Sequence, residues 1–388
     1  MNKSSKPDKL SYLKEVALLF LRIGATSFGG PAVYIAIMQR ETVRNRHWLS
    51  DQEFLDMVGA ANIIPGPNAT EMALYLGLVR GGWFGYLASG LLFIIPGMLA
   101  TLALAWIYVT YGSLPQVGWV LYGVKPIVIA IVVQALWDLG RKAVKNPLTA
   151  IVGIAVVIFY FFKVNEIALL FAGAAVVLLF QSGQHFIKKG LSALLVTPIL
   201  KIPEVIISAA AVPFSQTTLF ITFLKIGSVL YGSGYVLVAF FNSEFVERLG
   251  WITHHQLLDA IAVGQITPGP IASSATFIGY LMGGWSSALL ATLAFFIPSF
   301  VFVALLSRVM PYLRTKWWSG SFLDGVNVAS LGLMASVTWE LGRAGVTDWF
   351  TIILATASLF LVFKYKVNST WLILGGALLG IAYKLVVR

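Results

Sequence analysis

Residues 65–77 read PGPNATEMALYLG, and residues 268–279 read PGPIASSATFIG, so a Pro-Gly-Pro turn followed by a helical pattern occurs twice in the chain. Proline suits the first turn of a helix, and glycine permits the sharp bend that precedes it. Each turn therefore ends one helix and starts the next. Because long apolar runs surround both turns, the sequence predicts two interrupted helices at corresponding places in a duplicated protein.

The duplication extends along nearly the whole chain. A shift of 203 residues aligns Glu41 with Glu244 and Trp48 with Trp251. After a one-residue slip the alignment continues, with Gly77, Gly81, Gly82, Trp83 and Pro96 on Gly279, Gly283, Gly284, Trp285 and Pro298. We expect an N-terminal repeat at residues 1–182, a linker at 183–215 and a C-terminal repeat at 216–388.

The composition indicates a membrane protein. Hydrophobic residues make up 58% of the 388 residues and charged residues only 11%, and the mean hydropathy is +0.85. Several apolar runs approach the roughly 20 residues that a helix needs to cross a bilayer. The runs lack the alternation of membrane β-strands, so we expect an all-α polytopic protein. Residues 1–9 are short and basic, and the apolar segment from Leu10 onward is interpreted as a retained first helix.

The net charge of +11 is spread over short loops between apolar segments. This distribution is typical of cytoplasmic loops in membrane proteins, so we expect no nucleic-acid partner. The loop at residues 111–117 has no charge, whereas the equivalent loop carries Arg308, Arg314 and Lys316. Since the basic loops are exchanged between the repeats, the pattern favours an inverted-topology repeat. An inverted repeat requires an odd number of membrane crossings between equivalent points of the two repeats, and the apolar runs alone do not settle this number. Either the broken segments or the apolar stretch from Leu191 to Phe214 must supply one crossing.

The interrupted helices suggest an anion site. A helix that begins inside the membrane leaves its first amide groups unpaired and carries about half a positive charge at that end. The sequence suggests four such starts, two of them at the Pro-Gly-Pro turns and two more after Gly29–Pro31 and Gly232–Gly234, and if they converge near the midplane they would complement a dianion. The alternative is that the Pro-Gly-Pro turns only kink a helix or form surface loops. Arg22 and its equivalent Lys225 add cations within apolar segments, where an anion, snorkelling, or a carboxylate such as Glu71 or Asp56 would neutralise them. The predicted substrate-binding residues are Arg22, Ser27, Gly29, Gly30, Pro31, Pro65, Gly66, Pro67, Asn68, Thr70, Lys225, Pro268, Gly269, Pro270 and Ser273.

Four carboxylates are candidates for proton coupling: Glu41, Asp56, Glu71 and Glu244. Glu41 and Asp56 recur in both repeats, but charged loop residues lie nearby in the sequence, so surface ion pairs are an equally simple explanation. The chain has no cysteine, and its four histidines show no spacing typical of metal ligands. We therefore expect no metal, no cofactor and no enzymatic activity.

Long motifs resemble those of the chromate ion transporter family in its long-chain, two-domain form. They are SFGGPAVYIAIMQRETV at 27–43, WLSDQEFLD at 48–56, PGPNATEMALYLG at 65–77, and ITPGPIASSATFIGYLMGGW at 266–285 followed by FFIPSF. The resemblance implies a carrier of the bacterial inner membrane that exports chromate and confers chromate resistance, with sulfate as a related anion. The second repeat departs from the pattern, because Tyr231 to Gly234 stand where the first has Phe28 to Pro31.

Other functions remain open at this point. A carrier for sulfate or another oxyanion, working as a proton symporter or antiporter, fits the same residues, and so does a channel. A membrane enzyme acting on phosphorylated lipids would need a metal or nucleophile constellation that the sequence does not suggest. The expected partners are chromate or sulfate and the lipid bilayer, and a homodimer is an open alternative to a monomer.

Overall fold

The chain was analysed as a computed structural model, which describes residues 9–28, 31–112, 114–187, 213–231, 234–307 and 317–387. These residues form helices and connecting turns, so the expected all-α class is confirmed. The first repeat contains α1 (Lys9–Thr26), α2 (Pro31–Gln39), η1 (Arg40–Asn45), α3 (Asp51–Ala61), α4 (Asn68–Tyr111), α5 (Pro115–Ala143), α6 (Pro147–Phe161) and α7 (Glu166–Ile187).

The second repeat follows the same order. It contains α8 (Gln216–Val229), η2 (Gly234–Val236), α9 (Leu237–Phe241), η3 (Asn242–Arg248), α10 (His254–Ile266), η4 (Ile271–Ser273), α11 (Ser274–Leu306), α13 (Trp317–Gly345), α14 (Trp349–Tyr365) and α15 (Ser369–Val386). Among the described residues, five helices are long and apolar enough to cross a membrane: α4, α5, the stretch Ile271–Leu305, α13 within Gly320–Gly345, and α15. The molecule is a multi-pass membrane protein.

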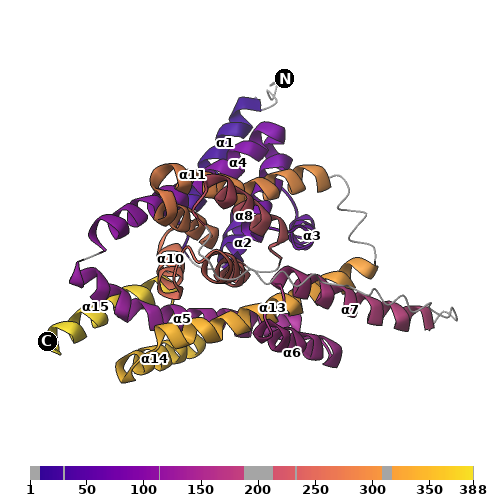
Figure 1. Cartoon of the computed structure of the whole chain (residues 1–388). Helices are drawn as coiled ribbons and strands as arrows, with labels where there is room; N and C mark the ends of the chain where they lie inside the picture. The colour runs from indigo at the N-terminus through magenta and orange to yellow at the C-terminus, as the bar shows by residue number, and fades with distance from the viewer. Residues whose placement is uncertain are drawn as a thin grey trace.

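The helices form two layers (Figure 1). One layer contains α1, α2, α3 and α4 with α8, α10 and α11, and the other contains α5, α6 and α7 with α13, α14 and α15. Helix α10 joins the layers, because it packs against both α5 and α13. Each repeat therefore contributes its interrupted helices to one layer and its uninterrupted helices to the other.

Helices α4 and α11 each fold back on themselves. In α4, Gly82 has φ 61° and ψ −153°, which breaks the helix after its first 14 residues. The two arms lie side by side, because the backbone of Gly77 faces Gly85 and Ser89. In α11 the break is at Gly283 and Gly284, and the hydroxyls of Thr276 and Thr292 are 2.7 Å apart across the arms. The Gly-Gly-Trp motif in both repeats thus forms the bend of a helical hairpin.

The equivalent helices α5 and α13 run antiparallel. Gly140 of α5 lies against Leu331, near the middle of α13, whereas Ile129 lies against Gly342, farther along α13. Moving back along α5 therefore means moving forward along α13. If both helices cross the bilayer, the two repeats have opposite orientations, as the exchanged loop charges predicted.

The repeats exchange their last helices. Helix α7 of the first repeat packs on α13 of the second, and α15 of the second packs on α5 of the first. The contacts are equivalent: Gly325 lies against the backbone of Gly173, and Gly123 lies against the backbone of Gly376. Small residues permit this close approach of helices in a membrane protein. The two repeats are therefore units of the sequence, and in three dimensions they pack together as one unit.

Most of the predicted linker at 183–215 lies outside the described residues, because α7 ends at Ile187 and the description resumes at residue 213. The apolar stretch from Leu191 to Phe214, which was one candidate for the missing crossing, falls largely in the same interval. The loop with Arg308, Arg314 and Lys316 also lies outside the described residues.

Candidate functional site at the helix breaks

The helix breaks of the two repeats meet one another. The backbone N–H of Gly66 donates to the carbonyl of Leu230 at 2.6 Å, and the N–H of Gly269 donates to the carbonyl of Ser27 at 3.2 Å. These two bonds are equivalent, because the 203-residue shift converts Ser27 to position 230 and Gly66 to position 269. Each Pro-Gly-Pro turn therefore binds the end of the first helix of the other repeat. We call residues 27–28, 65–68, 230–231 and 267–271 the central turns.

Further contacts connect the central turns into one group. The hydroxyl of Tyr34, in the first turn of α2, donates to the carbonyl of Gly269. In the second repeat, η2 packs against η4, so the two interrupted helices of that repeat also begin side by side. The turns are shielded from solvent, since Pro65, Gly66, Pro67, Gly269 and Pro270 are all buried. The structure thus excludes the alternative that the Pro-Gly-Pro turns are separate surface loops.

Both turn glycines have a backbone that favours glycine. Gly66 has φ 144° and Gly269 has φ 85°. Their surroundings differ, however. A Cβ atom at Gly66 would overlap the side chains of Glu71 and Ser299, whereas one at Gly269 would lie 3.3 Å from Cα of Gly97. The first turn therefore faces polar side chains, and the second packs against backbone.

The predicted neutral ligands lie close to the turns. Thr70 and Ser273 occupy equivalent places in the first turn of α4 and in η4, and both are buried. The hydroxyl of Thr70 has no hydrogen-bond partner among the described residues. The Ser273 hydroxyl is 3.5 Å from that of Thr267. Asn68 is partly buried and donates to Asn62. Gly29 and Gly30 lie outside the described residues, and Pro31 begins α2.

Glu71 is the carboxylate closest to the central turns. It is fully buried, and its carboxylate interacts with the Ser299 hydroxyl without forming a well-aligned hydrogen bond to any described residue. Its side chain borders Gly66 beside Ser299, which comes from the Pro298 kink of α11 in the other repeat. The sequence singled out Glu71 but gave no sign of Ser299, whose equivalent in the first repeat is Gly97.

The two predicted cations lie away from the turns. Lys225 and Arg248 both pair with Glu244, a predicted coupling carboxylate. Arg22 is exposed on α1. Its charge helps to stabilise ionised Glu41, a carboxylate that the sequence did not pair with it.

Glu41, in η1, is held as an anion by its neighbours. It forms an ion pair with Arg46 and accepts a hydrogen bond from Asn45 at 3.2 Å. Burial raises the pKa of Glu41, but the hydrogen bond and charge of Arg46, the charge of Arg22 and the Asn45 bond lower it more, so the pKa lies below its usual range. A group that stays ionised at neutral pH is a poor proton carrier.

The fourth predicted carboxylate differs between the repeats. Asp56 is partly buried and accepts a hydrogen bond from Gln52 at 3.1 Å. Its equivalent, Asp259, is buried between the repeats, where Tyr108 donates to it at 2.9 Å and Lys125 lies 3.3 Å away. The sequence did not predict this inter-repeat ion pair, because Lys125 is remote in the chain and follows no local pattern.

Comparison with known proteins adds the family. A family model described as chromate transporter matches twice, over residues 14–179 and 217–381. The chain belongs to the chromate transporter family. The two matches fall on the two repeats, so the family unit is one repeat, and this chain carries two.

Relatives match over almost the full chain. A probable chromate transport protein of Synechococcus elongatus is 31% identical over 96% of this chain and 95% of its own length. A chromate transport protein of Cupriavidus metallidurans is also 31% identical, over 96% and 94%. A protein of Methanocaldococcus jannaschii named only as an uncharacterized transporter is 26% identical over 98% of both chains. No solved structure matches the chain.

Proposed function

We propose that this protein carries chromate, a tetrahedral dianion, across a bacterial plasma membrane by way of the central turns. The observation that carries the proposal is the reciprocal pair of hydrogen bonds from Gly66 to Leu230 and from Gly269 to Ser27. They join interrupted helices of two oppositely directed repeats, which is the arrangement in which membrane carriers build a site near the midplane. Membership of a transporter family favours transport over catalysis.

The helix starts supply the attraction for the anion. Helices α2 and α4 begin at Pro31 and Asn68, beside the central turns, and their first N–H groups lack partners within the helix. Such an end carries about half an elementary positive charge. The hydroxyls of Thr70 and Ser273 add neutral donors beside these ends. A dianion is therefore bound by amides and hydroxyls, while Lys225 stays paired with Glu244.

Glu71 sets the pH response in this proposal. Complete burial of an ionised carboxylate is very costly, and the Ser299 hydroxyl beside it does not offset that cost, so we propose that Glu71 is protonated in this conformation. The protonated carboxyl can donate a hydrogen bond to the oxyanion, whereas the ionised form would repel it. Glu71 thereby links proton binding to oxyanion binding, and Glu41, which remains ionised, has no such role.

The membrane potential determines the direction of transport. Moving two negative charges out of an inside-negative cell is favourable by about 2 × 2.3 kcal/mol per 100 mV. We therefore propose export, driven by the potential and modulated by Glu71. Uptake of the same dianion would need accompanying cations.

The test is a flux measurement on protein reconstituted in liposomes. Radiolabelled chromate flux is followed while the potential and the pH gradient are imposed separately. We expect wild-type flux to respond to both. The Glu71→Gln variant, which keeps a neutral donor, is expected to respond to voltage alone, and Glu71→Ala to lose about tenfold in rate because the hydrogen bond is removed.

A matched control is Ser274→Ala, since Ser274 occupies the equivalent of Glu71 and, within the described part of the chain, donates only to the carbonyl of Ile271. This variant should keep the wild-type response to voltage and pH. Unchanged pH dependence in Glu71→Gln would remove Glu71 from the coupling. Chromate flux no faster than in protein-free liposomes would contradict the transport proposal itself.

A further inference from the structure

The equivalent hairpins of the two repeats are packed differently. In the second repeat Val236, Ala239 and Phe240 are buried, with exposed fractions of 1%, 0% and 2%. Their equivalents on α2 are not: Val33 is 43% exposed and Ala36 is also exposed. The cover in the second repeat comes from α13, which packs against both η2 and α9. Helix α2 instead packs against α4 and η1, so the face equivalent to the covered one is open.

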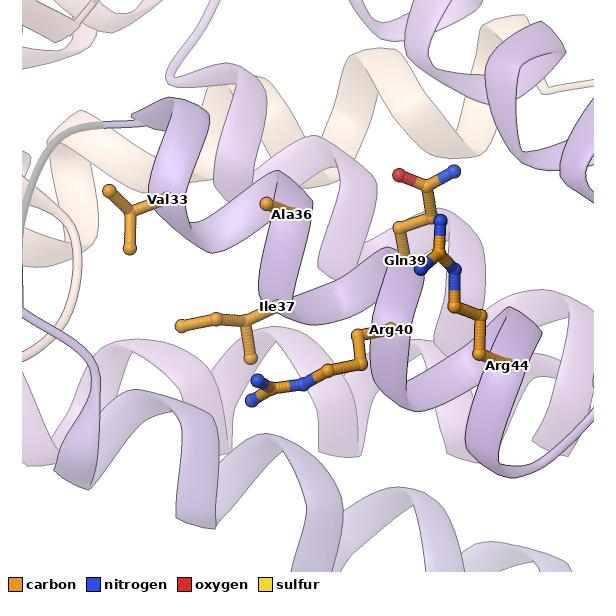
Figure 2. A pocket seen from close by; sticks show the side chains of 6 residues that line it. All are labelled: Val33, Ala36, Ile37, Gln39, Arg40 and Arg44. Atoms are coloured by element: carbon orange, nitrogen blue, oxygen red, sulfur yellow. The ribbon is translucent and has the colours of Figure 1, made fainter.

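A hollow of about 560 Å³ follows this open face. Figure 2 shows the side chains that line it, arranged along α2 and η1 from Val33 to Arg44. It begins at Val33, two residues after the start of α2 at Pro31, and its other end carries two arginines. The lining residues are Val33, Ala36, Ile37, Gln39, Arg40 and Arg44. Two cations and an amide suit an anion better than a lipid chain.

In the second repeat the equivalent space is closed by a polar network. The hydroxyl of Tyr160 lies 2.8 Å from Glu247 and 3.0 Å from Glu340. The amide of Asn242 donates to both carboxylates at 2.9 Å, and Lys163 pairs with Glu247 at 2.7 Å. The network joins η3 to α6 and α13. It therefore holds the second hairpin against the uninterrupted helices.

We propose that the hollow along α2 and η1 is the open access path for the oxyanion, with Arg40 and Arg44 as its anion-recruiting site, and that the path along α9 and η3 is the same path in its closed form. The inference rests on the proposed transport function. A carrier with inverted repeats alternates by exchanging the conformations of its repeats. In this structure the path along α2 and η1 is therefore open, and the path along α9 and η3 is closed.

The closed form of the first path follows from the alignment. Glu247 is equivalent to Arg44, and Glu340 is equivalent to Asp138. Because the network of Tyr160 and Asn242 bridges Glu247 to Glu340, closing the first hairpin in the same way brings Arg44 to Asp138. Asp138 is exposed in the present state. Opposite charges at these positions would close the path with an ion pair and would release the anion from Arg44.

The first test uses cysteine labelling, which the cysteine-free chain makes specific. Ala36→Cys and Ala239→Cys occupy equivalent positions and form a matched pair. A charged, membrane-impermeant thiol reagent is added to both faces of permeabilised membranes, without any oxyanion. We expect Ala36→Cys to react at least about tenfold faster, because the open form of the second path is a minor state. Equal rates, or a slow reaction at Ala36→Cys as expected for a lipid-facing side chain, would overturn the open path.

The second test traps the closed form. On mild oxidation the double variant Arg44→Cys/Asp138→Cys is expected to form an intramolecular disulfide, and Arg40→Cys/Asp138→Cys to form less, since the equivalent of Arg40 is Ser243, outside the closing network. The reduced double variant is expected to move chromate more slowly than the wild type, because Arg44 is lost; the disulfide should stop this remaining efflux from liposomes, and reduction should return it to the rate of the reduced variant. Absence of a disulfide, or full efflux with it, would overturn the closing contact.

The outcomes separate this inference from the proposed function. Labelling and disulfide formation do not depend on the substrate. If both behave as expected while the wild type moves no chromate, the access path stands and the substrate assignment fails. If chromate moves but Ala36→Cys and Ala239→Cys react alike, the transport proposal stands and the access path fails.

Discussion

The two Pro-Gly-Pro turns have the same sequence and different surroundings. The turn at Gly66 faces Glu71 and Ser299, whereas the turn at Gly269 packs against Gly97 and accepts a hydrogen bond from Tyr34. Neither polar residue is repeated in the other half of the chain, because Ser274 stands at the equivalent of Glu71 and Gly97 at the equivalent of Ser299. Duplication therefore preserved the backbone that brings the turns together. Side-chain differences then made one turn polar and the other close-packed.

This difference assigns separate tasks to the two turns. The second turn is held by close backbone contacts, and a Cβ on the facing Gly97 would lie only 2.5 Å from the carbonyl oxygen of Pro268, so this turn stabilises the junction between the repeats. The first turn offers a buried carboxyl and a hydroxyl that form no well-aligned hydrogen bond to any described residue, so it can respond to a ligand. Substitutions at equivalent positions should therefore have unequal effects.

The largest effect is expected for Gly66→Ala. Alanine is strained at φ 144°, and its methyl group would displace Glu71 and Ser299. We expect a loss of about 3 kcal/mol in unfolding free energy, together with loss of the pH response of chromate flux. Gly82→Ala is the control, because Gly82 also has positive φ but no atom within 4 Å of the added carbon. If both variants lose the same stability in detergent unfolding, the side-chain contacts at Gly66 contribute nothing.

A smaller effect is expected for Gly97→Ala. The new Cβ would lie 2.5 Å from the carbonyl oxygen of Pro268, a backbone atom that cannot rotate away. We expect a loss of about 2 kcal/mol in unfolding free energy, with the pH response of flux preserved. Ser299→Ala is the matched control, because that position already carries a side chain, and it should cost less than about 1 kcal/mol. Equal losses would show that the two turns are equally close-packed.

The duplication and the helix breaks could be predicted from the sequence because each leaves a local or periodic signal. Pro65 to Pro67 and their equivalents predict the end of one helix and the start of the next. The exchange of basic loops between the repeats predicted the opposite directions in which α5 and α13 run. Helix lengths in the second layer follow from apolar runs bounded by capping residues such as Asn146 and Asp348.

The partners of the predicted residues could not be predicted, because they depend on packing between distant segments. Nothing near Glu71 in the chain points to Ser299, and nothing near Asp259 points to Lys125. Lys225 pairs with Glu244, and nothing in the sequence indicates that these two residues lie side by side. The exchange of α7 and α15 between the repeats is likewise a matter of packing. Sequence periodicity fixes which face of a helix is apolar, and it leaves open which helix covers that face.

A modest effect is expected for Tyr34→Phe at the second turn. The change removes the hydrogen bond to the carbonyl of Gly269 and leaves that buried oxygen unpaired. We expect a loss of about 1 kcal/mol in unfolding free energy, measured in detergent, with unchanged voltage dependence of flux. The equivalent position in the second repeat is Leu237, which makes no such bond, so Leu237→Phe tests a change of volume alone. A changed pH response in Tyr34→Phe would place the second turn in the coupling as well.

The smallest effect concerns a pair of helix caps that repeats the comparison of the two turns. Asn146 caps α6 through Thr149, and Asp348 caps α14 through Thr351 in the same way. Burial raises the pKa of Asp348, but hydrogen bonds from Tyr122 and Thr351 outweigh it and hold the pKa below its usual range. The stabilisation by ionised Asp348 is therefore complete above its unfolded-state pKa and is lost as the pH falls through its folded-state value. Asp348→Asn, which copies the neutral cap, should lower stability by less than about 1 kcal/mol at neutral pH and remove this part of the acid sensitivity. The check is the unfolding midpoint of both proteins from pH 7 to acid, and parallel curves would show that the Asp348 charge contributes no stability.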